Sequence, residues 1–233
     1  MGIKENLSVV KKQIEDAARA CGRNPAEIRL IAVSKTKPAS MVMEAYESGM
    51  RDFGENRVQE LVEKYDEVPK DVRWHLIGHL QKNKVKYLLE KTELIHSLDS
   101  IDLAKEIQKR ASAAGKVQNV LIQVNVTGEE SKFGVPKERL TDFCEAVSQF
   151  ENICVKGLMT ISVKDYTEAQ NRAVFEELHR LFDEVKAKEL KNFSMQELSM
   201  GMTHDFPAAV AAGATMIRIG TAIFGERQYP AVE

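Results

Sequence analysis

The chain has 233 residues, enough to bury a sizeable core, and we expect one domain over residues 1–233 because α/β barrels routinely fill this length. Hydrophobic residues make up 43% and charged residues 29% of the sequence, which argues against disorder and against a membrane-protein composition. The net charge of -2 gives no overall basic field for nucleic acid or an anionic membrane, so small molecules are the expected partners.

The predicted elements alternate between helix and strand from end to end. An amphipathic helix comes first and stops at Gly22. Short apolar runs then recur, with amphipathic helical stretches between them. The expected strands cover residues 28–34, 52–54, 74–78, 94–98, 119–126, 154–160, 195–199 and 216–219. The clearest expected helices cover residues 3–21, 56–65, 101–114, 136–150 and 167–188.

This alternation is typical of a parallel sheet. Eight strand and helix units in a chain of this length predict a closed (β/α)8 barrel of the TIM type, with an extra N-terminal helix. A doubly wound open sheet is the alternative. It is disfavoured because the chain after the first strand reads SKTKP, with no G-x-G-x-x-G turn for a dinucleotide.

Nothing in the sequence indicates export or membrane attachment. Cys21, Cys144 and Cys154 form no C-x-x-C pair, as expected in a reducing compartment. Residues 1–20 are charged throughout, and no stretch reaches the roughly 20 apolar residues of a membrane span. We therefore expect a cytoplasmic protein.

Lys35 is the first candidate for chemistry. In a barrel the active site lies at the carboxyl ends of the strands, and Lys35 stands at the end of the first one. Side-chain alternation places Ile31, Val33 and Lys35 on one face, which aims the amine into the barrel mouth if the two apolar residues point inward. A lysine that simply reaches solvent is the commoner alternative.

The last strand carries the second candidate. Arg218 interrupts the apolar run MIRIG, on the same face as Met216 and Gly220. A buried guanidinium needs a partner, and the plain alternative is a structural salt bridge to a carboxylate on a neighbouring strand. Gly220 and Thr221 open a short helix, and barrels often hold a phosphate at the loops after strands seven and eight.

The loop after the seventh strand supplies the other half of the expected anion site. Ser199, Gly201 and Thr203 offer hydroxyl groups and a flexible backbone, and Asp205 is the expected N-cap of a short Ala-rich helix that ends near Gly213. Such a loop can cradle an anion, although capping alone explains hydroxyl and acidic residues before a helix. With the lysine and the arginine, it predicts a pocket for an aldehyde that carries a phosphate.

Seven blocks along the chain carry a resemblance to a known family. They are AVSKTKP (32–38), FGENRVQE (53–60), WHLIGHLQKNK (74–84), SKFG (131–134), GLMT (157–160), LSMGMTHDF (198–206) and IRIGTAIFG (217–225). On these blocks the chain resembles the pyridoxal phosphate homeostasis protein family. The resemblance implies a fold-type III barrel like the N-terminal domain of alanine racemase, which binds pyridoxal 5'-phosphate (PLP), controls its free level and delivers it to acceptor apoenzymes.

The resemblance also implies roles for single residues. Lys35 would hold PLP as a Schiff base, Arg218 would face the pyridine nitrogen, and Asn56 would lie near the ring. The implied residues on the phosphate side are Ser199, Gly201, Thr203, Gly220 and Thr221. The family usually has serine where Thr203 stands, so we expect a slightly altered phosphate contact.

These roles favour binding over catalysis. Burial beside another cation favours the free amine that attacks an aldehyde, and an arginine that keeps its proton leaves the ring nitrogen unprotonated and the ring a poorer electron sink. The sequence ends eight residues after Gly225, so we expect no C-terminal domain with a second catalytic base. We expect a monomeric binding protein. The alternatives are a slow PLP-dependent amino-acid racemase or transaminase, and a class I aldolase that uses Lys35 without a cofactor.

Three further features are ambiguous. His75 and His79 lie four residues apart, but no zincin pattern accompanies them, so we expect hydrogen-bonded histidines at the barrel mouth and no metal. Lys132 is either a second amine that catches PLP during transfer or a solvated loop lysine. The basic run over residues 82–91 is interpreted as the solvated face of a helix and not as a nucleic-acid site.

Overall fold

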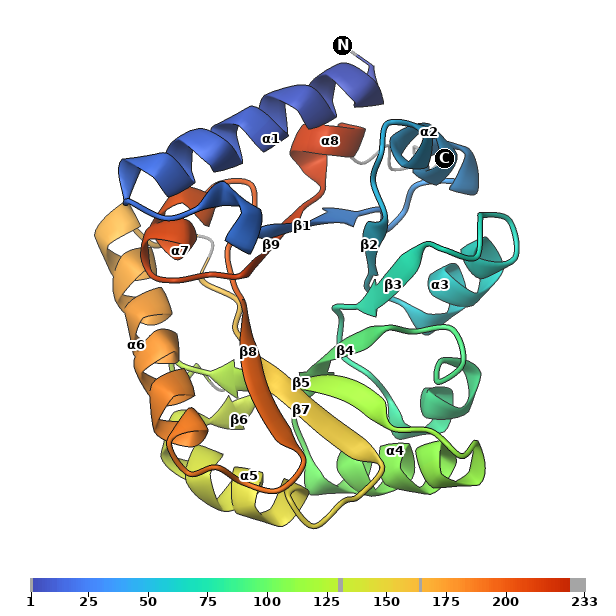
Figure 1. The fold of residues 1–233 in the computed structure, drawn as a ribbon, viewed down its shortest axis with the longest axis vertical. Helices are drawn as coiled ribbons and strands as arrows, with labels where there is room; N and C mark the ends of the chain where they lie inside the picture. Colours follow the sequence, from blue (N-terminus) through green and yellow to red (C-terminus); the bar gives the residue numbers. More distant parts are fainter. Residues whose placement is uncertain (1, 130–131, 164, 227–233) are drawn as a thin grey trace, which may run out of the picture.

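The computed structural model describes residues 2–129, 132–163 and 165–226. In these residues a closed ring of eight parallel strands is surrounded by helices (Figure 1). The strands of the ring are β1 (Arg29–Val33), β2 (Asp52–Glu55), β3 (Arg73–Leu76), β4 (Leu94–Leu98), β5 (Gln118–Asn125), β7 (Ile153–Met159), β8 (Phe193–Ser199) and β9 (Met216–Ile219). β1 pairs with β2 and with β9, and the pairing of β4 with β5 closes the ring. The predicted (β/α)8 barrel is therefore confirmed.

All eight predicted strands are confirmed, with ends displaced by at most two residues. A ninth strand, β6 (Val135–Pro136), was not predicted, and it pairs only with the carboxyl end of β5. Two residues are too few to show a period in the sequence, so this strand leaves no pattern to detect.

The predicted long helices are confirmed with changed ends as α1 (Ile3–Ala20), α3 (Val58–Tyr65), α4 (Ile101–Ala113), α5 (Leu140–Val147) and α6 (Glu168–Lys186), followed by the short α7 (Phe206–Ala211) and α8 (Thr221–Phe224). The helix α2 (Ala39–Glu47) was not predicted. The helix expected over residues 136–150 is shorter in the structure, because a 3-10 turn at Lys137–Arg139 precedes α5. The basic run starts a 3-10 helix at Lys82–Tyr87 instead of an α-helix. No helix in the described residues combines the length and the apolar character that a bilayer span demands.

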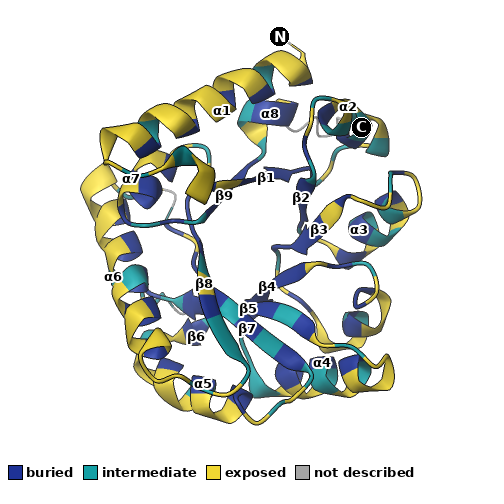
Figure 2. Cartoon of the chain, viewed as in Figure 1, coloured by how far each residue is buried: buried dark blue, intermediate teal, exposed yellow. Residues whose placement is uncertain are grey.

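Side chains of the strands divide between two regions. Leu30 and Ala32 of β1 pack into the large apolar core between the barrel and the helices, whereas Ile31 points into the barrel. Figure 2 shows that the strands and the inner faces of the helices are buried while the outer faces of the helices are exposed. Trp74 belongs to the outer core and is 1% exposed. The inward apolar cluster consists of Ile31, Leu94, Leu121, Met159 and Met216.

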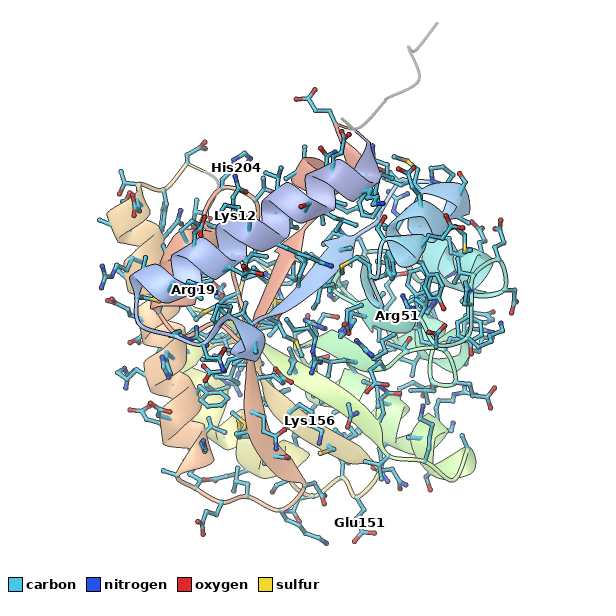
Figure 3. The ribbon with its side chains drawn as sticks, turned by 45° about the horizontal axis from the view of Figure 1, so that its top comes forward. Lys12, Arg19, Arg51, Glu151, Lys156 and His204 are labelled. Carbon is cyan, nitrogen blue, oxygen red and sulfur yellow. The ribbon has the colours of Figure 1, made fainter. Side chains whose placement is uncertain are left out.

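The N-terminal helix α1 lies against α7 and α8, the two elements that follow the last barrel strands (Figure 1). The Asn6 side-chain amide donates to the Ile223 carbonyl at 2.9 Å, which ties α1 to α8. The outer face of α1 carries exposed Lys12 and Arg19 (Figure 3). Its buried stripe consists of Ile3, Leu7, Val10, Ile14 and Ala18. The extra helix thus supports the loops in which the anion site is expected.

Candidate functional site

A cavity of about 440 Å³ lies at the carboxyl ends of the barrel strands. Residues that follow β1, β2, β3, β7, β8 and β9 line it, so the ring gathers segments far apart in the sequence. The structure brings most of the predicted site residues together there. Those that line the cavity are Lys35, Asn56, Thr203, Arg218, Gly220 and Thr221, whereas Ser199 and Gly201 do not.

Positive charge predominates among the described side chains that line the cavity. Lys35, Lys37 and Arg218 line it, and no carboxylate does so among the residues that the structure describes. The Lys37 ammonium donates to the Glu226 carbonyl at 2.7 Å, which holds this cation at the rim. A concave site lined by several positive charges attracts small ligands with more than one negative charge. A phosphate monoester is such a ligand.

Arg218 lies at the inner end of the cavity and is 5% exposed. Its NH1 donates to Ser199 Oγ at 2.6 Å and its NH2 donates to the Thr160 carbonyl at 2.9 Å. Burial lowers the pKa of Arg218 to about 10, against the opposing charge of Asp205, so the guanidinium is still protonated at neutral pH. The alternative of a structural salt bridge is not met, because within the described ranges no carboxylate forms an ion pair with Arg218.

Ser199 is placed differently from what the resemblance implied. Its hydroxyl is fully buried inside the barrel, where it accepts from Arg218 and lies 2.9 Å from His96 Nδ1. In this structure Ser199 therefore supports the guanidinium from within the barrel and does not line the expected phosphate cup. Its position at the last residue of β8 explains the difference, since an inward side chain there lies deeper than the loop residues that follow.

Gly201 supports the cavity from outside it. Its φ is +90°, and a Cβ there would lie 2.6 Å from Ala209 Cβ, so only glycine lets α7 pack this closely on the loop. The Gly201 carbonyl accepts from the Arg218 backbone N–H at 3.1 Å, which joins the loop to β9. Gly201 thus sets the register between the two predicted halves of the anion site.

The predicted phosphate side consists of Thr203 and the Gly220–Thr221 turn. A Cβ at Gly220 would lie 3.0 Å from the Val33 carbonyl, so this glycine allows the start of α8 to approach β1. Asp205 occupies the predicted N-cap position of α7, but its side chain makes no capping bond to the helix. It accepts instead from the Met202 N–H at 2.6 Å, which fixes the turn that carries Thr203.

A buried ion pair holds the segment that carries Lys35. The Lys64 ammonium donates to Glu55 Oε1 at 2.6 Å and to the Ser34 carbonyl at 2.9 Å, and the Ser34 hydroxyl donates to the same Glu55 oxygen at 2.7 Å. Burial raises the pKa of Glu55, against the opposing effect of Lys64. We call these three residues the Lys64 clamp. It fixes the residue immediately before Lys35, and sequence analysis missed it.

The residue after Lys35 is also fixed. Thr36 adopts a left-handed φ of 64°, and its N–H donates to Glu60 Oε2 at 2.7 Å. A non-glycine residue holds this conformation only where its surroundings impose it. Lys35 itself is half-buried and lines the cavity. The turn therefore aims the amine into the barrel mouth, as the alternation of β1 predicted.

His75 and His79, whose role was ambiguous in the sequence, lie in different parts of the barrel. His75 is fully buried inside the barrel, with Nε2 3.1 Å from Asp52 Oδ1, so the prediction that it lies at the mouth is wrong. His79 does lie at the mouth, where its Nδ1 is 3.2 Å from Asp99 Oδ2 and its ring stacks on Phe133 at 4.0 Å. Across the described segments, no three His, Cys, Asp or Glu side chains come together as metal ligands.

Lys132 does not line the cavity. Its ammonium is 3.5 Å from Glu129 Oε1 and is shielded from solvent, so it is not a solvated loop lysine in this structure. The neighbouring Phe133 does line the cavity. The second role considered for Lys132, a contact with PLP during transfer, stays a prediction.

Sequence analysis missed part of the rim and part of the interior. The missed rim residues include Gln123, Phe133, Ile161, Met202 and His204, the last of which is labelled in Figure 3. His96 on β4 was missed as well, although alternation with Leu94 would have placed it inside the barrel. The signal was present, because every strand of a barrel can be read for inward polar side chains.

Comparison with known proteins identifies the family. The family model of the alanine racemase N-terminal domain matches residues 5–228. The pyridoxal phosphate homeostasis protein of Aquifex aeolicus (strain VF5) is 46% identical over 230 residues, which cover 98% of this chain and 100% of that protein. The protein of the same name from Pseudomonas aeruginosa is 42% identical and covers 98% and 97%. This chain belongs to the pyridoxal phosphate homeostasis protein family.

Solved structures agree with this membership. PipY of Synechococcus elongatus, solved with PLP bound, has a TM-score of 0.84 and 36% identity, covering 96% of this chain and 100% of that chain. A protein of unknown function from Bifidobacterium adolescentis has a TM-score of 0.92 and 35% identity, covering 95% and 94%. The alanine racemase of Clostridium difficile is 14% identical with a TM-score of 0.71, and the match covers 57% of it. That likeness shows the shared barrel alone.

Proposed function

We propose that this protein binds PLP in the barrel-mouth cavity, holds it as a Schiff base on Lys35, and acts in intracellular PLP homeostasis by delivering it to acceptor apoenzymes. The observation that carries the proposal is the composition of one cavity wall, which unites an amine, a buried guanidinium and hydroxyl groups without a carboxylate. The PLP seen in PipY and the names of the relatives support it.

The residues present fit the chemistry of PLP, a flat aromatic aldehyde with a phosphate. The cavity has apolar walls for the ring, including Val33, Ile77 and Phe224. Its cations balance the phosphate charge, and Thr203 and Thr221 offer hydroxyl donors on the side where barrels commonly bind phosphate. When bound, PLP supplies a reactive aldehyde that an amine can capture reversibly.

Each residue then has a distinct task. Lys35 would supply the amine that condenses with the aldehyde carbon with loss of one water, and water would reverse the reaction. Arg218 would donate to the ring nitrogen, and Asn56, which also lines the cavity, would lie near the ring. Thr203, Thr221 and the Gly220 backbone hold the phosphate. Reversible capture protects the aldehyde and permits its release.

The residues that line the cavity also argue against efficient catalysis. Among the described lining residues there is no tyrosine, cysteine, aspartate or glutamate, and the bases other than lysine are His79 and His204. An always-charged donor at the ring nitrogen also keeps this nitrogen unprotonated and weakens electron withdrawal. The relatives are named homeostasis proteins and not enzymes. We therefore propose a binding protein and not an enzyme, and we propose on the sequence alone that it is monomeric and cytoplasmic.

A PLP titration followed by visible absorption tests the proposal. The wild type should develop the visible band of a lysine imine, and Lys35→Ala should not. Lys37→Ala is the matched variant, because it removes a cation from the same wall. It should bind several-fold more weakly but keep the band. A full band in folded Lys35→Ala would contradict the assignment.

Incubation with single-enantiomer amino acids tests the racemase and transaminase alternatives. The PLP-loaded protein should invert or transaminate them no faster than free PLP at the same concentration. A rate well above that of free PLP would favour an enzyme.

A further inference from the structure

A chain of hydrogen bonds runs inside the barrel, away from the cavity. Arg218 NH1 donates to Ser199 Oγ at 2.6 Å, and this oxygen lies 2.9 Å from His96 Nδ1. His96 Nε2 lies 3.0 Å from His75 Nδ1. His75 Nε2 in turn lies 3.1 Å from Asp52 Oδ1. All five side chains are buried, so bulk water does not compete for these bonds.

The far end of the chain is an ionised carboxylate. Asp52, the first residue of β2, accepts from Arg73 Nε at 2.9 Å and from Arg73 NH2 at 2.5 Å. Burial alone would raise the pKa of Asp52, but the hydrogen bonds from Arg73 and His75, with the charge of Arg73, hold it well below its ordinary value. Arg73 begins β3 and its side chain is 49% exposed. The chain therefore reaches from the cavity to the amino ends of the strands.

The two charged ends set one direction for every bond. A guanidinium can only donate and an ionised carboxylate can only accept. Each group between them then accepts on the Arg218 side and donates toward Asp52. In this direction the Ser199 hydroxyl donates to His96 Nδ1, and each imidazole carries its proton on Nε2. Burial, together with the charge of Arg218, lowers the pKa of His96 well below its usual value, which agrees with a neutral ring.

The reverse direction, in which His75 and His96 donate toward Arg218, satisfies the hydrogen-bonding groups of the chain less well. It needs an extra proton in the interior, on His75, and a proton on His96 Nδ1 that points at Ser199 Oγ. This oxygen would then accept from His96 and from Arg218, and its own proton would have no acceptor in the chain. A buried hydroxyl without an acceptor destabilises the folded state. The direction from Arg218 to Asp52 leaves no such group.

We propose that His96 and Ser199, anchored through His75 on the Asp52 carboxylate, are positioning residues for Arg218. The chain fixes the orientation of the guanidinium that lines the cavity. The part of this inference that concerns PLP rests on the function proposed above. Barrel interiors are commonly filled by branched apolar residues, and apolar replacement of a buried polar network is often neutral or stabilising, so a role in the site explains why this interior is polar.

Heteronuclear NMR of the histidine ring nitrogens tests the direction of the chain in the PLP-free protein. At neutral pH both His96 and His75 should be Nε2-protonated neutral tautomers. A proton on His96 Nδ1 would overturn the inference. This measurement does not depend on whether the protein binds PLP.

PLP titrations of variants in the hydrogen-bond chain test the positioning role. His96→Phe breaks the chain without touching the cavity wall, and it should weaken PLP binding by about tenfold, as expected for the loss of about 1.4 kcal/mol. Asp52→Asn keeps the shape of the anchor but removes its negative charge. It should weaken binding less and shift the pH midpoint of the visible band to lower pH, because a more positive interior disfavours protonation beside Arg218.

Ser97→Ala is the matched control. Ser97 is the neighbour of His96 on β4, and its buried hydroxyl has no hydrogen-bond partner in the described part of the chain. Ser97→Ala should keep the wild-type affinity and pH midpoint.

The outcomes separate the inference from the proposed function. Wild-type affinity and pH midpoint in folded His96→Phe and Asp52→Asn would overturn the positioning role and leave PLP binding intact. If His96→Phe fails to fold, Asp52→Asn alone decides. A wild type that does not bind PLP would overturn the proposed function and the PLP part of the inference, while the tautomers would still decide the direction of the chain.

Discussion

The two interiors of this barrel differ in composition. The layer between the strands and the helices is almost entirely apolar and contains most of the buried large side chains. The space inside the ring holds only five clustered apolar residues, and the rest of its described buried groups include the chain from Arg218 to Asp52. Burial of apolar area is the main stabilising term in folding. The outer layer therefore supports the fold, and the inner region orients a cation toward the cavity.

Truncation of the outer layer should have the largest effect on stability. Phe175 of α6 is fully buried in this layer, and Phe175→Ala should lower the free energy of unfolding by about 3–5 kcal/mol. Folded protein should still bind PLP with an affinity close to that of the wild type. Urea unfolding and a PLP titration check the two effects. A loss below about 1 kcal/mol would contradict the division between the two regions.

The Lys64 clamp is a polar exception within the outer layer. Lys64→Met leaves the Glu55 carboxylate buried without its ammonium partner, and the free energy of unfolding should fall by about 3 kcal/mol at neutral pH. Because burial raises the pKa of Glu55, the folded state holds its proton more tightly than the unfolded chain. Stability is therefore retained at low pH and lost as the pH rises through the folded pKa.

Unfolding at two pH values checks this prediction. The loss in Lys64→Met should be larger at about pH 8 than at about pH 5. Lys12→Met is the control, since Lys12 forms an exposed pair with Asp16 on α1 and should change stability by less than about 0.5 kcal/mol at either pH. An equal loss at both pH values would count against a buried, partnerless carboxylate.

The smallest expected effect concerns the reactivity of the cysteines, and its test needs no substitution. Burial raises the pKa of the Cys144 thiol to about 12, so little thiolate forms at neutral pH. Cys21 is exposed at the end of α1. A thiol reagent should modify Cys21 in the native protein and reach Cys144 only on unfolding. Rapid native labelling of Cys144 would show that the outer layer opens locally.

The outer layer was the easier region to predict from sequence. Runs such as LIHSL and MIRIG have the length and apolar content of barrel strands, and side-chain alternation correctly put Ile31 on one face with Lys35, and Arg218 on one face with Met216. Alternation assigns a face but not a depth along the barrel axis. Ser199 and His75 were therefore assigned to the mouth, although both lie deeper. The partners of Arg218 come from distant strands, and no local pattern encodes those distances.

The cavity itself was predictable in outline because each barrel strand contributes its next residues to one mouth. Lys35, Thr203 and Gly220 were found in this way, and the structure brings them to one wall. The Lys64 clamp was not found, since a lysine in an amphipathic helix ordinarily faces solvent. Only the tertiary contact with Glu55 shows that Lys64 is buried.

Borohydride reduction of the PLP-loaded protein, followed by peptide mass spectrometry, tests the central claim most directly. Reduction converts a lysine imine into a stable amine, so the modified lysine keeps the pyridoxyl group through digestion. We predict that the group is found on the peptide that contains Lys35. A pyridoxyl group on Lys37 or Lys132, with Lys35 unmodified, would contradict the account.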